Sequence, residues 1–92
     1  MYSKKTVVVN ATGLHARPAS DFVREAKKWT SRITIANLST PEEDPANAKS
    51  IISVLSLGMG KGTEVEVVAK GDDEEAAVEA LVALIDGGFG EL

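Results

Sequence analysis

The chain has 92 residues, and residues 1–92 are expected to form a single domain because this length leaves no room for a second. Acidic residues (14) outnumber basic residues (10), and the resulting net charge of −4 argues against a nucleic-acid-binding protein. The sequence contains no cysteine and one histidine, which excludes disulfides, thiolate metal sites and a metal site built from several histidines of this chain.

Hydrophobic periodicity and turn residues divide the chain into short elements. Alternating β-branched residues predict strands, apolar residues three and four positions apart predict helices, and clusters of proline, glycine and acids predict loops. In chain order the pattern predicts a strand at 6–9, a loop at 10–14, a helix at 16–29, a strand at 32–37, an acidic loop at 39–46 and a short edge strand around 47 and 48. It then predicts a helix at 51–57, a strand at 64–69, a helix whose first turn holds the four acids at 72–75 and which stops at 87–88, and a fraying tail at 89–92.

The element order βαββαβα, with strands that bury one face, favours an α+β fold. We expect an open-faced β-sandwich in which a four-stranded antiparallel sheet carries three helices on one face. The apolar sides of the two longer helices should contribute much of the core. These core positions are Phe22, Ala26, Trp29, Ala77, Val78, Leu81 and Ile85.

The segment 13–20 places His15 at the expected start of the first helix. The first N–H groups of a helix have no internal partner and carry the positive end of its dipole, so they can bind a phosphate. The same dipole should leave the ring neutral, with a lone pair that can attack phosphorus. We therefore predict that His15 accepts a phosphoryl group and that Arg17 helps to stabilise it. Thr12 has two open interpretations, a hydroxyl that orients the ring or ordinary turn chemistry.

Two groups of side chains on the predicted helices are candidates for contacts with partners. Helical spacing places a basic stripe along the first helix, which we interpret as a docking surface for acidic partners rather than an ordinary solvated face. The basic stripe consists of Arg17, Ser20, Arg24, Lys27 and Lys28. The helix at 51–57 has more apolar residues than one buried side can hold, so we expect Val54 and Leu57 to be buried and an apolar patch to remain partly exposed. The apolar patch consists of Ile51, Ile52 and Leu55.

Ser50 and Gly58 are expected to bound this helix, as its N-cap and its stop. The glycine-rich segment 58–62 is superficially similar to a phosphate-binding loop. It follows a helix and precedes a strand, which is the reverse of the order that such loops need. We therefore interpret it as a connector.

Two segments resemble one known family. Gly13-Leu14-His15-Ala16-Arg17-Pro18-Ala19 is similar to the active-site signature of HPr, the histidine-containing phosphocarrier family of the bacterial sugar phosphotransferase system. Lys49-Ser50-Ile51-Ile52-Ser53-Val54-Leu55-Ser56-Leu57-Gly58 is similar to the regulatory-serine helix of that family. The resemblance covers essentially the whole chain, and it implies the open-faced sandwich, a phosphoryl group on Nδ1 of His15 and regulatory phosphorylation of Ser50. The loop at 38–46 departs from the family, since it is longer than the usual tight turn and contains three successive acids.

The resemblance implies a phosphoryl carrier rather than an enzyme with its own turnover. Enzyme I, charged by phosphoenolpyruvate, would phosphorylate His15, and the group would pass to enzyme IIA components for sugar uptake. No cofactor or metal is expected, because positioning and charge stabilisation suffice for such a transfer. A serine kinase or phosphorylase and a transcriptional regulator are further implied partners. We expect a cytoplasmic monomer without membrane insertion, since no secretory signal is visible and the apolar run 80–85 is too short to span a bilayer.

Three alternatives remain open. The protein could be a regulatory interaction protein that acts through phosphorylated Ser50 on a transcriptional regulator, although family members of that kind lack the active-site histidine that this chain keeps. It could instead be a carrier of the nitrogen branch, with the same chemistry. The third alternative is a small phosphate-binding enzyme, for which no general base other than His15 is visible.

Overall fold

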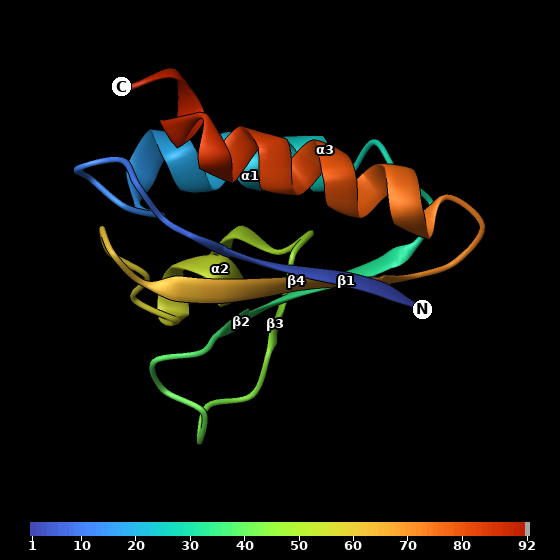
Figure 1. The fold of residues 1–92 in the computed structure, drawn as a ribbon, viewed down its shortest axis with the longest axis horizontal. Coiled ribbons are helices and arrows are strands. Elements are labelled where there is room, and N and C mark those ends of the chain that lie inside the picture. Colours follow the sequence, from blue (N-terminus) through green and yellow to red (C-terminus); the bar gives the residue numbers. More distant parts are fainter. Residues whose placement is uncertain (92) are drawn as a thin grey trace.

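The computed structural model describes residues 1–91, in which helices α1 and α3 lie side by side over one face of an antiparallel sheet (Figure 1). The short helix α2 packs against α1 and β3. The elements in chain order are β1 (Tyr2–Val7), α1 (Ala16–Ala26), β2 (Arg32–Asn37), β3 (Ala46–Asn47), α2 (Ile51–Ser56), β4 (Glu64–Lys70), α3 (Glu74–Asp86) and the 3-10 helix η1 (Gly88–Gly90). The predicted order βαββαβα and the predicted four-stranded antiparallel sheet with three α-helices are confirmed over these residues.

Strand β4 lies in the interior of the sheet, whose order is β1-β4-β2-β3. Its register places Ala69 opposite Tyr2 of β1 and Lys70 opposite Arg32 of β2. Since side chains alternate along a strand, every second residue of β4 faces the helices. The residues of β4 on that side are fully buried: Val65, Val67 and Ala69. The alternation predicted for this strand is therefore confirmed.

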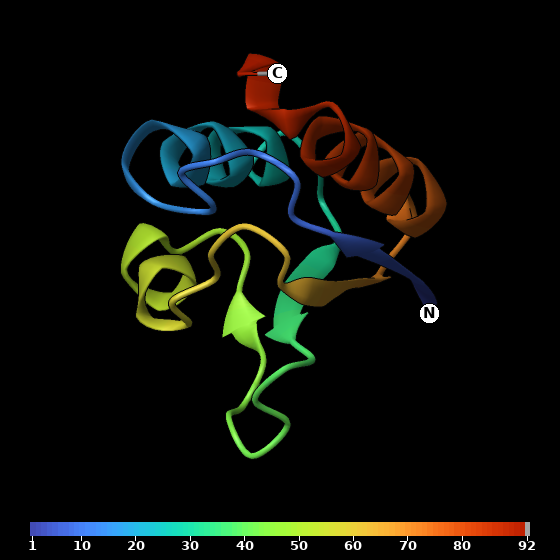
Figure 2. The ribbon, with the colours of Figure 1, turned by 60° about the vertical axis from the view of Figure 1, so that its left-hand side comes forward.

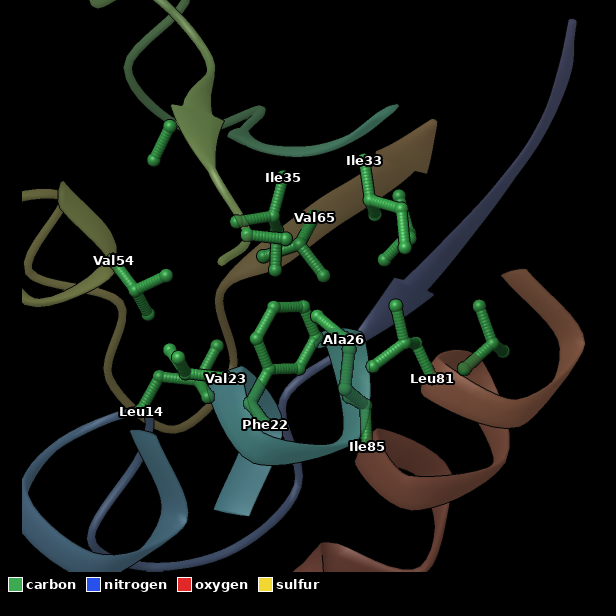
Figure 3. Close-up of a cluster of buried hydrophobic side chains, with 14 of the residues drawn as sticks. Leu14, Phe22, Val23, Ala26, Ile33, Ile35, Val54, Val65, Leu81 and Ile85 are labelled. Atoms are coloured by element: carbon green, nitrogen blue, oxygen red, sulfur yellow. The ribbon is translucent and has the colours of Figure 1, made fainter. Parts of the chain in front are cut away.

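The core lies between the sheet and the two long helices, with Phe22 of α1 at its centre (Figure 3). The ring of Phe22 is fully buried, and burial of such a side chain contributes about 1.5–3 kcal/mol. The core positions predicted on the helices are buried except Trp29, which packs against the core while remaining half-exposed. Its indole N–H donates to the carboxylate of Glu25 at 3.2 Å.

The first strand lies earlier than predicted, at Tyr2–Val7 instead of 6–9. Its side chains toward α3 are polar and bind polar partners on that helix, so β1 shows no hydrophobic alternation. The Tyr2 hydroxyl donates to Glu79 at 2.5 Å, Lys4 Nζ lies 3.0 Å from the same carboxylate, and Thr6 donates to Asp86. The hydrogen bond from Tyr2 and the ion pair with Lys4 lower the pKa of Glu79.

Both long helices are shorter than predicted. Helix α1 ends at Ala26 rather than at 29, because the next turns tighten: the N–H groups of Lys28 and Trp29 bind carbonyls three residues earlier, at 3.1 and 3.3 Å. Helix α3 begins at Glu74 rather than at 72, so two of the four acids precede it. The apolar side predicted for α3 is buried as expected.

The tail predicted to fray is instead folded as far as residue 91. Helix η1 is closed by the N–H of Glu91, which binds the carbonyl of Gly88 at 2.9 Å. Phe89 packs against the core, and the positive φ of Gly88 (+64°) and Gly90 (+77°) allows this reversal of the chain. The prediction was therefore wrong for residues 89–91, and Leu92 lies outside the described residues.

The remaining short elements agree with the sequence. The edge strand β3 has two residues, Ala46–Asn47, and the acidic loop before it is exposed and projects away from the helices (Figure 1). Helix α2 begins at Ile51 as predicted and ends at Ser56, one residue early. Over residues 1–91, no helix combines the length and the hydropathy needed to cross a membrane.

Close backbone packing holds the loop before α1 in place. Gly13 has a φ of +66°, and a Cβ at this position would lie 2.5 Å from the carbonyl oxygen of Met59. The fully buried Leu14 donates its N–H to the same carbonyl at 2.8 Å. The segment 58–62 connects α2 to β4, as predicted, and it also supports the loop that presents His15.

A single carboxylate joins the start of α3 to the segment between α1 and β2. Asp73 accepts hydrogen bonds from the backbone N–H groups of Thr30 (2.8 Å) and Ser31 (2.9 Å) and from both hydroxyl groups. The Ser31 hydroxyl and the Thr30 N–H have the largest effect on Asp73, whose pKa these bonds lower to about 2. Gly71 allows this approach, because a Cβ there would lie 2.8 Å from Ser31 Cα.

We predict that Asp73→Asn lowers the urea midpoint of unfolding and flattens its acid dependence. The lowered pKa of Asp73 means that its contribution is complete above about pH 4 and is lost as the pH falls toward 2. The wild type should therefore lose free energy of unfolding more steeply than the variant in this window. Urea titrations at several pH values measure both slopes, with Asp72→Asn as the control. Equal slopes in the wild type and Asp73→Asn would contradict a role for these hydrogen bonds.

We also predict that Gly13→Ala destabilises the protein more than Gly62→Ala. Both glycines have positive φ (+66° and +88°), so either alanine adds about 1–2 kcal/mol of backbone strain. A Cβ at position 62 meets nothing within 4 Å, whereas one at position 13 collides with the backbone of the connector. Thermal melts of the two variants give the comparison, and an equal loss of stability in both would show that the packing at Gly13 is looser than described.

Candidate functional site

His15 stands at the boundary between the supported loop and α1, as predicted. It is the N-cap residue of the helix, with extended backbone angles (φ −123°, ψ 161°), and its side chain makes no capping hydrogen bond. The residue is exposed, whereas Leu14 before it is fully buried. The imidazole ring is therefore available to a reacting group that approaches from solvent.

The backbone at Ala16 makes this exposure possible. Ala16 has a φ of +45°, in the left-handed region that non-glycine residues rarely adopt, at a cost on the order of 1–3 kcal/mol. Buried residues lie on both sides of it, with Leu14 in the loop and Ala19 in the helix. The turn at Ala16 thus lets the chain bury its apolar side chains while His15 faces outward.

The first turn of α1 concentrates positive charge beside His15. The N–H groups of Ala16 and Arg17 lie where no helical carbonyl can reach them, Pro18 has no N–H, and no acidic residue lies in this turn. The helix dipole adds about half an elementary charge at the same end. Arg17 is exposed, and its guanidinium forms no ion pair within residues 1–91. An anion bound at this end of the helix can therefore use both backbone donors and the Arg17 side chain.

A hydrogen-bonded group behind the loop had no counterpart in the sequence analysis. The fully buried Asn10 donates from Nδ2 to the carbonyl of Gly13 (2.9 Å) and to the carboxylate of Glu91 (3.0 Å). The Thr12 hydroxyl donates to the same carboxylate at 2.8 Å. The Thr12 hydroxyl also accepts from Asn10 Nδ2 at 3.2 Å, and within residues 1–91 it forms no hydrogen bond with the His15 ring. No local pattern could reveal this group, because Asn10 and Glu91 lie 81 positions apart.

The residues of the basic stripe are all exposed, but two of its charges are paired. Arg24 lies 3.3 Å from Asp21 and Lys28 lies 3.2 Å from Glu25, each three positions earlier on the helix. Exposed pairs of this kind contribute less than about 1 kcal/mol to stability. The two paired carboxylates also lower the net positive charge of this surface.

The tertiary structure brings part of the basic stripe next to the apolar patch. In Figure 2, α1 and α2 lie one above the other on the same side of the molecule. A surface hollow of about 300 Å³ lies between them. Its lining residues are Ser20, Val23, Arg24, Lys27 and Ile51. Cationic and apolar side chains from two helices therefore share one concave surface.

The apolar patch is exposed in the way the sequence predicts. Ile52 is 78% exposed, and Ile51 and Leu55 are 37% and 39% exposed. Val54 and Leu57, which the sequence places in the core, are buried. Exposed apolar side chains grouped on one short helix are typical of a surface that contacts another protein.

Ser50 caps α2 at the edge of this patch. Its hydroxyl oxygen accepts the N–H of Ser53 at 3.3 Å, and its carbonyl accepts the N–H of Val54 at 3.0 Å. The side chain is half-buried, and its position as N-cap confirms the sequence prediction. Within residues 1–91, no group of three His, Asp or Glu side chains is arranged to hold a metal ion.

The sequence and the structure are similar to known proteins over nearly their whole length. A family model described as "PTS HPr component phosphorylation site" matches residues 2–87. The chain is 45% identical over 85 residues to the phosphocarrier protein HPr of Haemophilus influenzae, which covers 92% of this chain and 95% of that protein. It is 42% identical over 86 residues to the HPr-like protein Crh of Halalkalibacterium halodurans, covering 94% and 98% of the two chains.

Similarity extends to solved structures and to part of a longer protein. The crystal structure of HPr-C-His from Thermoanaerobacter tengcongensis superposes with a TM-score of 0.92 at 44% identity, over 100% of this chain and 99% of that one. The chain is also 44% identical over 82 residues to the multiphosphoryl transfer protein of Haemophilus influenzae, of whose length it spans 16%. Because the family model covers most of the chain and the fold agrees throughout, the protein belongs to the HPr family, the phosphocarrier proteins of the phosphotransferase system.

Proposed function

We propose that this protein carries a phosphoryl group on His15, which it accepts from phosphorylated enzyme I and passes to enzyme IIA components during sugar uptake. The observation that carries the proposal is the placement of the chain's one histidine, exposed at the N-terminus of α1 beside the first backbone amides, which have no partner within the helix. Membership in a phosphocarrier family supports the same role.

The transfer needs little from the protein beyond position and charge. A ring nitrogen of His15, Nδ1 by resemblance to the family, attacks phosphorus in line with the leaving group of the donor, through a loose transition state. The product has a charge of about −1.5 to −2, which the helix N-terminus and Arg17 stabilise. The dipole contributes at most about 2 kcal/mol, so the phosphoryl group stays transferable.

The hollow between α1 and α2 is the proposed contact surface for enzyme I and enzyme IIA. It combines the cations Arg24 and Lys27 with the exposed apolar side chain of Ile51. Cationic groups at the rim of an interface accelerate association with an acidic partner, and the buried apolar contacts stabilise the complex. The proposed partner-binding residues are Ser20, Arg24, Lys27, Ile51, Ile52 and Leu55.

A second role, regulation through phosphorylation of Ser50, has support from its position. Ser50 lies at the N-terminus of α2, where a phosphate meets free amides, and directly beside the apolar patch. One relative, 42% identical to this chain, is named an HPr-like protein, Crh, rather than HPr. This degree of identity therefore leaves room for a second role besides that of a carrier. We propose that phosphorylation of Ser50 by a serine kinase weakens the docking of enzyme I and favours contact with a transcriptional regulator.

The first prediction from this proposal concerns His15→Ala. Labelling by phosphoenolpyruvate and enzyme I should occur on His15 alone, and the label should be acid-labile and alkali-stable, as expected for a phosphoramidate. His15→Ala should abolish it while the melting temperature hardly changes, because an exposed residue without a capping bond contributes about 0.5 kcal/mol or less. Undiminished labelling of the folded variant would refute the proposed function.

The second prediction compares Ser50→Asp with Ser50→Ala. The aspartate can keep the cap, so stability should be maintained, but its charge should slow phosphorylation of His15 by enzyme I about a hundredfold, as expected for several kcal/mol of repulsion at an interface. Ser50→Ala should lose about 1 kcal/mol of stability and react at the wild-type rate. Stopped-flow or quench-flow transfer assays measure these rates.

The control for Ser50→Asp is Ser39→Asp, which adds the same charge at an exposed position in the loop after β2. This variant should react as fast as the wild type. If Ser50→Asp is phosphorylated at the wild-type rate, Ser50 is only a helix cap. If Ser39→Asp is slowed to the same degree, the effect belongs to net charge rather than to position.

A further inference from the structure

Three cations lie together at the end of the sheet where β2 begins. The strand register places Arg32 of β2 directly opposite Lys70 of β4. On the other side of β2, the N–H of Ala48 binds the carbonyl of Ile33 at 3.0 Å, which continues the pairing beyond β3 and brings Lys49 toward Arg32. Positive charge from three separate segments of the chain is therefore gathered at one end of the sheet.

These cations have no acidic partner. Within residues 1–91 none of the three forms an ion pair, although the chain contains 14 acids. The pKa of Glu74 is lowered mainly by the amino group of Met1, 2.8 Å away, and only slightly by Lys70. Like charges directly opposite each other on neighbouring strands are destabilising, as Arg32 and Lys70 are here. An anion at this end of the sheet would relieve that repulsion.

Two of the cations line a surface hollow of about 520 Å³, a size typical of sites for small molecules. Lys49 Nζ donates to the carbonyl of Trp29 at 2.7 Å, which fixes the ammonium group while leaving it further N–H donors. The Thr34 hydroxyl and the Asn47 amide nitrogen form no hydrogen bond within residues 1–91, because Asn47 uses only its oxygen, for the N–H of Lys49. The hollow is lined by Arg32, Ile33, Thr34, Pro45, Asn47 and Lys49.

We propose that this hollow binds a small phosphate monoester, with the phosphate between Arg32 and Lys49. A guanidinium can donate two parallel hydrogen bonds to a phosphate, and an ammonium group adds a point charge. At neutral pH such a phosphate has a charge of about −1.5 to −2, which offsets the repulsion between the cations. The polar body of the ligand then lies against the free donors of Thr34 and Asn47.

This hollow is separate from the site at His15. Lys49 binds the carbonyl of Trp29, three residues beyond the C-terminal end of α1, whereas His15 caps the N-terminal end of the same helix. The hollow beside Arg17 is lined by a different set of residues. Binding at Arg32 and Lys49 can therefore be measured independently of phosphoryl transfer.

The test is a titration of ribose 5-phosphate into ¹⁵N-labelled protein, followed by NMR in a phosphate-free buffer. The amide signals of residues 32–34 and 47–49 should shift together and saturate, with a Kd on the order of 1 mM for an open hollow with few contacts. Arg32→Gln should weaken binding about tenfold, because it removes charge-assisted hydrogen bonds. This variant should fold normally, since Arg32 is exposed and its replacement relieves the repulsion from Lys70.

Two control variants and a second probe separate this site from other sources of binding. Lys5→Gln removes the same charge from an exposed position on β1 and should bind like the wild type. Arg17→Gln removes the cation beside His15 and should leave the shifts at 32–34 unchanged. Inorganic phosphate should bind about tenfold more weakly than ribose 5-phosphate, because it has no body to contact Thr34 and Asn47.

Shifts confined to residues 15–18 would place the phosphate at the N-terminus of α1 and would overturn the proposal, as would the lack of any saturable shift. Equal affinity for inorganic phosphate would indicate an adventitious ion only, with the same consequence. An equal loss of affinity in Lys5→Gln and Arg32→Gln would assign the effect to net charge and would also refute the site. None of these readouts requires phosphorylation of His15, so the outcome is independent of the proposed function.

Discussion

The candidate site depends on one step of the backbone, from the fully buried Leu14 to the exposed His15. Leu14 can be buried because its N–H and the glycine before it pack against the carbonyl of Met59. His15 then faces outward because the left-handed turn at Ala16 leads directly into α1. Apolar burial thus supplies the free energy that holds a strained turn, and the strained turn presents the ring at the positive end of a helix.

The charges of this protein are distributed so that an acidic chain retains a positive site. Its net charge is −4, yet the first turn of α1 contains no acid, and Arg17 is unpaired within residues 1–91. Further along α1, Asp21 and Glu25 pair with cations of the basic stripe. The unpaired positive charge of α1 is therefore concentrated at its N-terminus rather than along the rest of the helix.

Helix α2 places exposed apolar side chains next to α1. Only its inner side is needed for the core, through Val54, so its remaining apolar side chains stay exposed beside α1. Ser50 caps this helix at the border of the apolar patch. The proposed phosphorylation of its hydroxyl would therefore place negative charge beside the surface proposed to contact a partner. In the proposed function, stability, docking and regulation would all depend on this one six-residue helix.

The sequence by itself determined the fold class, the helix that begins at Ala16 with His15 before it, and the two sides of α2, because each depends on local periodicity and capping. It placed the first strand too late, at 6–9 rather than at Tyr2–Val7, because the polar side chains of β1 find their partners only on α3. It also did not predict the folded turn at 89–91. It also could not place Glu91 beside Thr12 and Asn10, or Asp73 beside Ser31. These contacts join residues that are more than 40 positions apart, so only the packing of the helices on the sheet decides them.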